Sequence, residues 1–154
     1  MPTQVEQFAI WLPLAVGTGA VLCTILVHGL ALAAMINFFR RERRLGRSGA
    51  GPFIDLAIVA WVIVIALVAH LIEMALWAGV LVACGEFKEF GNAYYHSAVN
   101  YTTLGYGDVL LTPSWRLLGP IEATNGVLMF GVSTAMVFAV IGWLILDRFE
   151  DFEA

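Results

Sequence analysis

The sequence contains little charge. Only 13% of its 154 residues are Asp, Glu, Lys or Arg, whereas 60% are hydrophobic and the mean hydropathy is +0.85. A typical soluble domain is about 25% charged and about 45–50% apolar. The shortage of charge therefore excludes an ordinary soluble globular monomer.

Cysteine, histidine and basic residues are scarce as well. Neither Cys23 nor Cys84 has a partner at metal-ligand spacing, and no nucleophile or ligand set surrounds His28, His70 or His96. The eight Lys and Arg residues are outnumbered by 12 Asp and Glu, and five of the eight fall in one short cluster. That balance provides no basic surface for nucleic acid. We therefore expect no enzyme, no organic cofactor and no nucleic-acid partner.

Long uncharged runs, by contrast, are abundant. Residues 8–39 are 32 consecutive positions without a formal charge, and two further apolar stretches cover residues 53–83 and 121–146. About 20 residues are enough for a helix to cross a bilayer core, so we expect three transmembrane helices. A secretory signal is a poor alternative for the first run, because Glu6 but no Lys or Arg precedes it and because the run is too long.

An arginine cluster after the first run sets the expected orientation. Five arginines beside a span mark the cytoplasmic side, so the N-terminus would lie outside and the C-terminus in the cytoplasm. The first run itself contains no arginine, which argues against a voltage sensor. Arg40, Arg43, Arg44 and Arg47 follow helical spacing. They form either a stripe that contacts anionic membrane lipids or only a marker of topology.

The most informative string lies between the second and third runs and reads Thr102-Thr103-Leu104-Gly105-Tyr106-Gly107-Asp108. Two glycines around a tyrosine permit backbone angles closed to other residues, so that successive carbonyl oxygens point the same way. A row of such carbonyls, repeated in several subunits, replaces the water shell of a monovalent cation. Irregular backbone at membrane depth is tolerated only where it lines a water-filled path or is buried in protein.

A short helix is expected just before this string, over residues 92–102, with Gly91-Asn92 as its N-terminal cap. Its 11 residues, at about 1.5 Å each, cannot cross a bilayer. The segment must therefore be a re-entrant helix. The negative end of its dipole would then favour a cation near the string that follows.

On these residues the sequence resembles the potassium channel family, whose Thr-x-Gly-Tyr-Gly filter is matched by Thr103 to Gly107, with Asp108 following as in many members. The likeness covers about residues 53–146 and is to bacterial channels with two transmembrane helices per pore, here with an extra N-terminal helix. It implies an all-α integral membrane protein with three transmembrane helices, a re-entrant pore helix and a filter loop. One chain supplies one filter strand, so the resemblance implies a C4 homotetramer.

The resemblance also assigns roles along the chain. It divides the chain into an N-terminal helix with its arginine-rich linker (1–52), a pore domain (53–147) and a short cytoplasmic tail (148–154). K⁺ would bind at the filter, with the Thr103 hydroxyl as the innermost ligand. The filter residues are Thr103, Leu104, Gly105, Tyr106 and Gly107, of which the first four would hold K⁺, and Thr102 would support them.

In the third run, Gly126 and Gly131 look like the two glycines of the family's inner helix. They serve either as a gating hinge or as close-packing positions, because glycine suits both. Ser133 and Thr134 would then line the water-filled cavity.

The sequence departs from the family in the pore helix. Many bacterial members carry a glutamate four residues before the filter threonine that holds the aspartate after the filter, and here that position is Val99. Asp108 needs another partner. We expect that partner to be the hydroxyl of Tyr95.

Ionisable residues inside the apolar runs are the remaining candidates for function. His70 and Glu73 are three residues apart and share a helix face, and Glu122 enters the third run at a similar depth. Together they form either a polar network that senses pH or a static hydrogen-bonded brace. His28 is expected to hydrogen-bond between helices.

The expected function is passive, potassium-selective conduction in a plasma (inner) membrane, with K⁺ as the permeant ion. Two alternatives stay open. One is a weakly selective cation channel, and the other is a non-conducting membrane scaffold or regulatory subunit that retains a channel-like pore.

Overall fold

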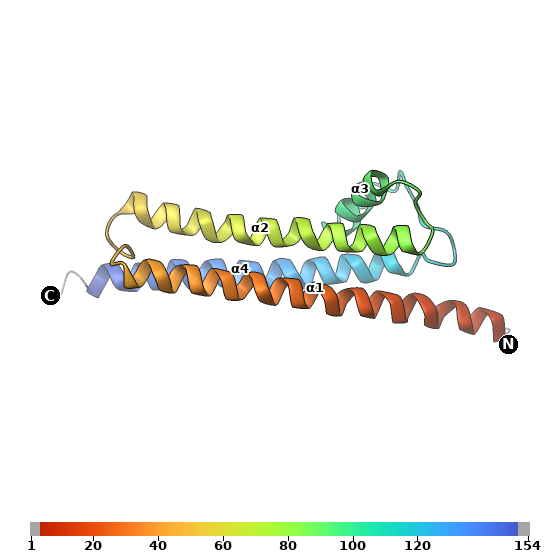
Figure 1. Cartoon of the computed structure of the whole chain (residues 1–154), viewed down its shortest axis with the longest axis horizontal. Coiled ribbons are helices and arrows are strands. Elements are labelled where there is room, and N and C mark those ends of the chain that lie inside the picture. The colour runs from red at the N-terminus through yellow and green to blue at the C-terminus, as the bar shows by residue number, and fades with distance from the viewer. Residues whose placement is uncertain (1–3, 151–154) are drawn as a thin grey trace. The chain divides into compact units, whose positions relative to one another are not determined.

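The computed structural model describes the backbone of residues 4–150 and the side chains of residues 10–148. Over residues 4–150 the chain forms four helices and no strand (Figure 1). The helices are α1 (Gln4–Arg44), α2 (Pro52–Ala83), α3 (Phe90–Tyr101) and α4 (Leu118–Glu150). The all-helical architecture predicted from the sequence is confirmed.

Three of the helices are long and apolar enough to cross a membrane. The candidate spans are Ile10–Arg44, Pro52–Ala83 and Leu118–Arg148, with mean hydropathies of 2.2, 2.6 and 2.2 over their most apolar windows. Only 22–28% of each window is buried inside the chain. Most of these apolar side chains therefore face outward, as the side chains of a multi-pass membrane protein do.

The helix boundaries differ from the predicted ones in three places. α1 continues through the first arginines to Arg44, because arginine is a good helix former, and the chain turns at Gly46, whose φ is +64°. α4 begins at Leu118 rather than near residue 121, because Pro120 is tolerated in the first turn, where its missing N–H has no partner to lose. α3 begins at Phe90, and the preceding Glu89 provides no side-chain cap, so the predicted Gly91-Asn92 cap is wrong.

The chain divides into two compact units, each containing parts of α1, α2 and α4. Unit 1 comprises residues 1–27 and 71–129, and unit 2 comprises residues 28–70 and 130–154. In unit 1 the helices approach closely at Gly17, where an added Cβ would lie 2.9 Å from the Ile121 side chain. The core of unit 2 consists of Met35, Phe39, Ile58, Val62, Ala66, Met136, Val140 and Leu144.

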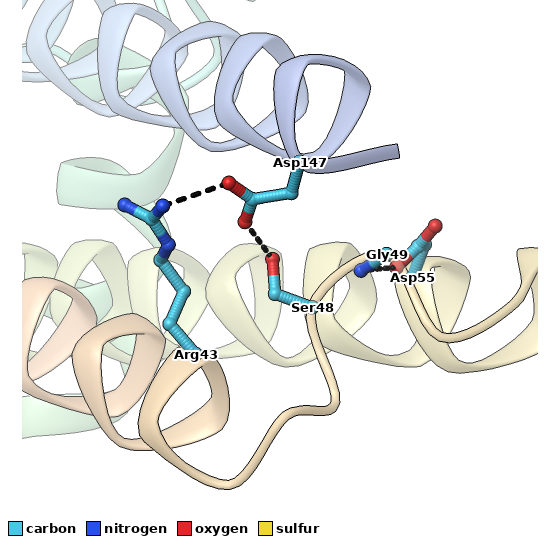
Figure 2. Close-up of polar contacts among 5 residues, drawn as sticks. All are labelled: Arg43, Ser48, Gly49, Asp55 and Asp147. Carbon is cyan, nitrogen blue, oxygen red and sulfur yellow. Dashed lines mark hydrogen bonds and ion pairs between the residues drawn. The ribbon is translucent and has the colours of Figure 1, made fainter. Parts of the chain in front are cut away.

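Polar contacts tie one end of unit 2 together. The guanidinium of Arg43 forms an ion pair of 2.8 Å with Asp147, whose carboxylate also accepts a hydrogen bond from the Ser48 hydroxyl (Figure 2). Close by, the Gly49 amide donates to Asp55 over 3.0 Å. These bonds connect the end of α1, the α1–α2 loop, the start of α2 and the end of α4.

Candidate functional site

The segment after α3 is held by its amides. The N–H groups of residues 102–105 all donate back to the last carbonyls of α3, at distances of 2.8–3.2 Å. Val99 accepts two of these bonds, from Leu104 and Gly105, and the Thr102 hydroxyl bonds the Ala98 carbonyl over 2.7 Å. These donors are committed to α3, and among the described residues no backbone hydrogen bond uses the carbonyl oxygens of residues 103–107.

The sign of φ alternates along the same segment. It is positive at Thr103 (60°), Gly105 (58°) and Gly107 (72°), and not at the intervening Leu104 and Tyr106. An extended strand points successive carbonyls to opposite sides, whereas a change of hand at every second residue brings them to one side. Thr103 is the only described non-glycine residue with positive φ, and such strain in a residue with a Cβ is a mark of functional segments.

No part of the described chain covers this segment. Every residue from Thr102 to Leu110 is exposed, with Leu104 at 55% and Tyr106 at 66%. A cavity of about 610 Å³ lies beside it, lined in part by His96, Asn100 and Arg116. A single chain therefore leaves this segment, including the large side chains of Leu104 and Tyr106, mostly uncovered by protein.

Three contacts pin the chain that follows the glycines. Tyr95 donates a 2.8 Å hydrogen bond to Asp108, and this bond raises the pKa of the tyrosine above its usual 10. The Val109 backbone is a polar neighbour of the His96 ring and favours the protonated form of that ring. Glu86, from the loop before α3, accepts from both the amide (2.7 Å) and the hydroxyl (2.6 Å) of Thr112. The Tyr95–Asp108 pair is the one expected from the sequence.

His96 is fixed on both sides. Its Nε2 lies 2.7 Å from the Nδ2 of Asn100, and its ring packs against Phe87 at a centroid distance of 5.2 Å. Because an amide nitrogen only donates, Nε2 accepts this bond and the neutral ring carries its proton on Nδ1. Burial lowers the pKa of His96, although Val109, Asp108 and Glu86 act in the opposite direction.

Behind α3, unit 1 buries two carboxylates. Glu73 of α2 is fully buried and accepts a hydrogen bond from the Tyr101 hydroxyl. Glu122 of α4 is equally buried; Ser97 is its polar neighbour, although the two groups do not meet full hydrogen-bond geometry in the described structure. Of the predicted polar network, Glu73 and Glu122 thus both lie near Tyr101.

The two glycines of α4 have different surroundings. A Cβ at Gly126 would lie 2.0 Å from the Tyr101 carbonyl oxygen, so this glycine allows α4 to pack against the end of α3. Nothing lies within 4 Å of the equivalent position at Gly131. Packing thus accounts for Gly126, whereas a hinge at Gly131 stays a prediction.

In unit 2, Ser133 lies between two histidines. Its hydroxyl is 3.1 Å from Nε2 of His28 on α1 and 3.0 Å from Nε2 of His70 on α2, and all three side chains are buried. The prediction that Ser133 lines a water-filled cavity is therefore wrong, because its hydroxyl is occupied by protein. The adjacent Thr134 is exposed and bonds the Phe130 carbonyl of its own helix. The interhelical hydrogen bond expected of His28 is present.

The predicted stripe of four arginines is also corrected. Arg43 pairs with Asp147, and Arg47 lies 3.3 Å from Glu42, so neither guanidinium is left for a continuous cationic stripe. Cys23, in the apolar first run, is exposed.

Sequence reasoning missed three contacts of this site: His96 with Asn100, Glu86 with Thr112, and Tyr101 with Glu73. The spacing of His96 and Asn100, four residues apart in one short helix, was a usable signal. No pattern connects Glu86 to Thr112, because the two lie in different loops and are brought together only by the fold.

Three helices long and apolar enough to cross a membrane, with a short helix and an exposed glycine segment between the second and third, define the class of an α-helical membrane protein. A family model described as "Ion channel" matches residues 56–142, which is more than half of the chain and includes α3 and the glycine segment. The chain belongs to this ion channel family. No curated protein and no solved structure matches it.

Proposed function

We propose that this chain is the subunit of a potassium-selective channel, with residues 103–107 as its selectivity filter. The observation that carries the proposal is the alternation of φ at Thr103, Gly105 and Gly107 in a segment whose first amides are tied back to α3. This combination supports a row of carbonyl oxygens free to coordinate an ion. Thr103 would add its hydroxyl at one end of the row.

The mechanism is passive. A K⁺ ion leaves its water shell when carbonyl oxygens replace the lost contacts, and neighbouring ions in single file help one another to leave. The sites would lie between Thr103 and Tyr106. No covalent step is involved, so the residues act by placing dipoles and by holding the backbone in shape.

The filter is incomplete in one chain, and we propose a C4 homotetramer around the ion path. One strand offers oxygens from one side only, whereas a dehydrated cation needs them all round. The exposure of Leu104 and Tyr106, together with the open cavity beside the segment, supports neighbouring subunits at this position.

We also propose that α3 is re-entrant. Its 12 residues span only about 18 Å at 1.5 Å each, less than the roughly 30 Å of a bilayer core. The arginine-rich end of unit 2 would face the cytoplasm, in keeping with a plasma-membrane protein whose N-terminus lies outside.

The test is ion flux from the purified full-length protein reconstituted in liposomes, with K⁺ and Na⁺ gradients compared and Ba²⁺ as blocker. We expect K⁺ flux that Ba²⁺ stops, Na⁺ flux at least tenfold lower, and four copies per particle by native mass spectrometry. Equal K⁺ and Na⁺ flux would instead identify a weakly selective cation channel. A folded tetramer without flux would identify a non-conducting scaffold.

A matched pair of variants distinguishes an effect on the proposed filter from the strain that any side chain causes at a position with positive φ. Gly105→Ala and Gly85→Ala both place a side chain at positive φ, 58° and 79° respectively, and neither position has a close steric neighbour. Gly85 lies in the loop before α3. We expect Gly105→Ala to abolish selective K⁺ flux and Gly85→Ala to leave the K⁺/Na⁺ ratio unchanged.

A further inference from the structure

The arginine-rich end of unit 2 has unequal charges. In the described structure three acidic side chains are each used by one arginine: Glu42 by Arg47, Asp147 by Arg43, and Asp55 by Arg148. Arg40, Arg41 and Arg44 have no acidic partner among the described residues. Three positive charges within about one helical turn therefore remain uncompensated.

These three arginines share a face of α1 with Asn37. Positions 37, 40, 41 and 44 follow the i, i+3, i+4, i+7 spacing that places side chains on one side of a helix. The opposite side carries Met35 and Phe39, which are buried in the core of unit 2. The arginine face thus points away from the protein, and Asn37 adds a polar group to it.

A cavity lies on this face. It measures about 460 Å³ and is lined by Asn37, Arg40, Arg41, Arg44 and Leu45. We propose that this cavity binds the phosphate of an anionic lipid headgroup, with the three guanidinium groups as its ligands. Guanidinium donors match phosphate oxygens in charge and in bidentate geometry.

The position along the helix favours a lipid over a soluble phosphate. Arg40 is the first charge after the uncharged residues 8–39, so the cavity lies where an apolar span reaches the headgroup layer. Marking of topology needs only the number of arginines on one side. Topology marking does not explain why the other three arginines pair with acidic residues. Nor does it explain why Arg40, Arg41 and Arg44 line one cavity.

The site is tested by native mass spectrometry of the full-length protein in detergent, with phosphatidylglycerol and phosphatidylcholine of equal chain length. We expect preferential retention of phosphatidylglycerol, and a loss of affinity of about fivefold for each arginine removed in Arg41→Gln and Arg44→Gln. The readout is binding, so it is independent of whether the protein conducts K⁺.

The matched control is the double variant Arg43→Gln, Asp147→Asn, which removes an arginine from the same helical turn together with its partner and leaves the net charge unchanged. Retention should stay at the wild-type level. An equal loss in this control, no preference for phosphatidylglycerol, or displacement of the lipid by millimolar inorganic phosphate would each overturn the proposal. The proposal would also be overturned if phosphatidylglycerol were retained only after Glu150, Asp151 and Glu153 are neutralised. The arginines would then pair with these acidic residues of the same chain.

Discussion

The hydroxyl of Tyr95 and the carboxylate of Asp108 are joined by a hydrogen bond of 2.8 Å that links the middle of α3 to the residue directly after Gly107. Because the pKa of Tyr95 is raised above 10, the hydroxyl keeps its proton, and remains a donor, throughout the physiological range. The two residues therefore hold the Gly107 end of the glycine segment against α3.

Removal of that bond should weaken the filter. Tyr95→Phe keeps the ring and deletes the donor to the Asp108 carboxylate, in a bond that solvent screens because it is exposed. We expect faster loss of K⁺ current during sustained conduction, by several-fold in single-channel records. The control is Tyr94→Phe, whose hydroxyl makes only a 3.4 Å contact with the Leu71 carbonyl. Equal kinetics in both variants would show that the bond is unimportant.

Acid on the side of the membrane that the 103–107 segment faces should reduce K⁺ flux, because it protonates His96. The neutral ring accepts from Asn100, and burial lowers its pKa in the folded protein. The unfolded segment binds a proton below about pH 6.5 while the folded one does not, so stability of the local fold falls as the pH drops below that value. Flux measured between pH 7.5 and 5.5 should decline.

The histidine variant His96→Gln has no titrating ring and should flatten that decline. Asp108 and Glu86 favour the protonated ring of His96, and the Arg116 guanidinium lines the same cavity. Because Glu86→Gln removes one of the two carboxylates, the acid response of this variant should start at a lower pH than that of the wild type. An acid response that persists in His96→Gln would assign it to another group.

Close packing at Gly126 should be indispensable. A methyl group there overlaps the Tyr101 carbonyl at 2.0 Å, and overpacking of this kind costs about 1–3 kcal/mol or more. We expect Gly126→Ala to lower the melting temperature of the purified assembly by several degrees. Gly131→Ala, at an open position of the same helix, should leave the melting temperature unchanged, and a change in its open probability would support the hinge.

Variants of the buried Glu73–Tyr101 pair can distinguish a static structural role from pH sensing. Tyr101→Phe removes a donor from a fully buried carboxylate and should destabilise the assembly by about 1–3 kcal/mol, whereas Glu73→Gln keeps an acceptor oxygen and should cost less. Thermal unfolding measures both. A conductance–pH curve that is the same in wild type and Glu73→Gln would assign the pair to a static role.

The long helices and the filter string could be read from sequence because each is a local property. The lengths of the apolar runs that begin at residues 8, 53 and 121 can be counted directly in the sequence. Gly105 and Gly107 permit the positive φ angles that the structure has. The Tyr95–Asp108 contact was predictable for a different reason: the acidic residue lacks the family's usual partner, and Tyr95 stands at a position where the resemblance implies a donor.

Contacts that depend on how helices rotate about their axes were not readable. Ser133 and Thr134 are adjacent and equally polar, and only the packed helix shows that the first lies against histidines while the second is exposed. The same holds for the arginines. Helical spacing grouped Arg43 with Arg40 and Arg44, but an aspartate more than 100 positions away takes Arg43 out of that group.

The single hydroxyl shared by His28 and His70 also constrains where protons lie. Ser133 has one hydrogen to give, and Nε2 of both rings is within bonding distance of its oxygen. If Ser133 donates to one ring, the other must carry its hydrogen on Nε2 and donate in return. At most one of the two rings can therefore accept from Ser133, and a change of tautomer that makes one ring the acceptor requires the other ring to donate to the same oxygen atom.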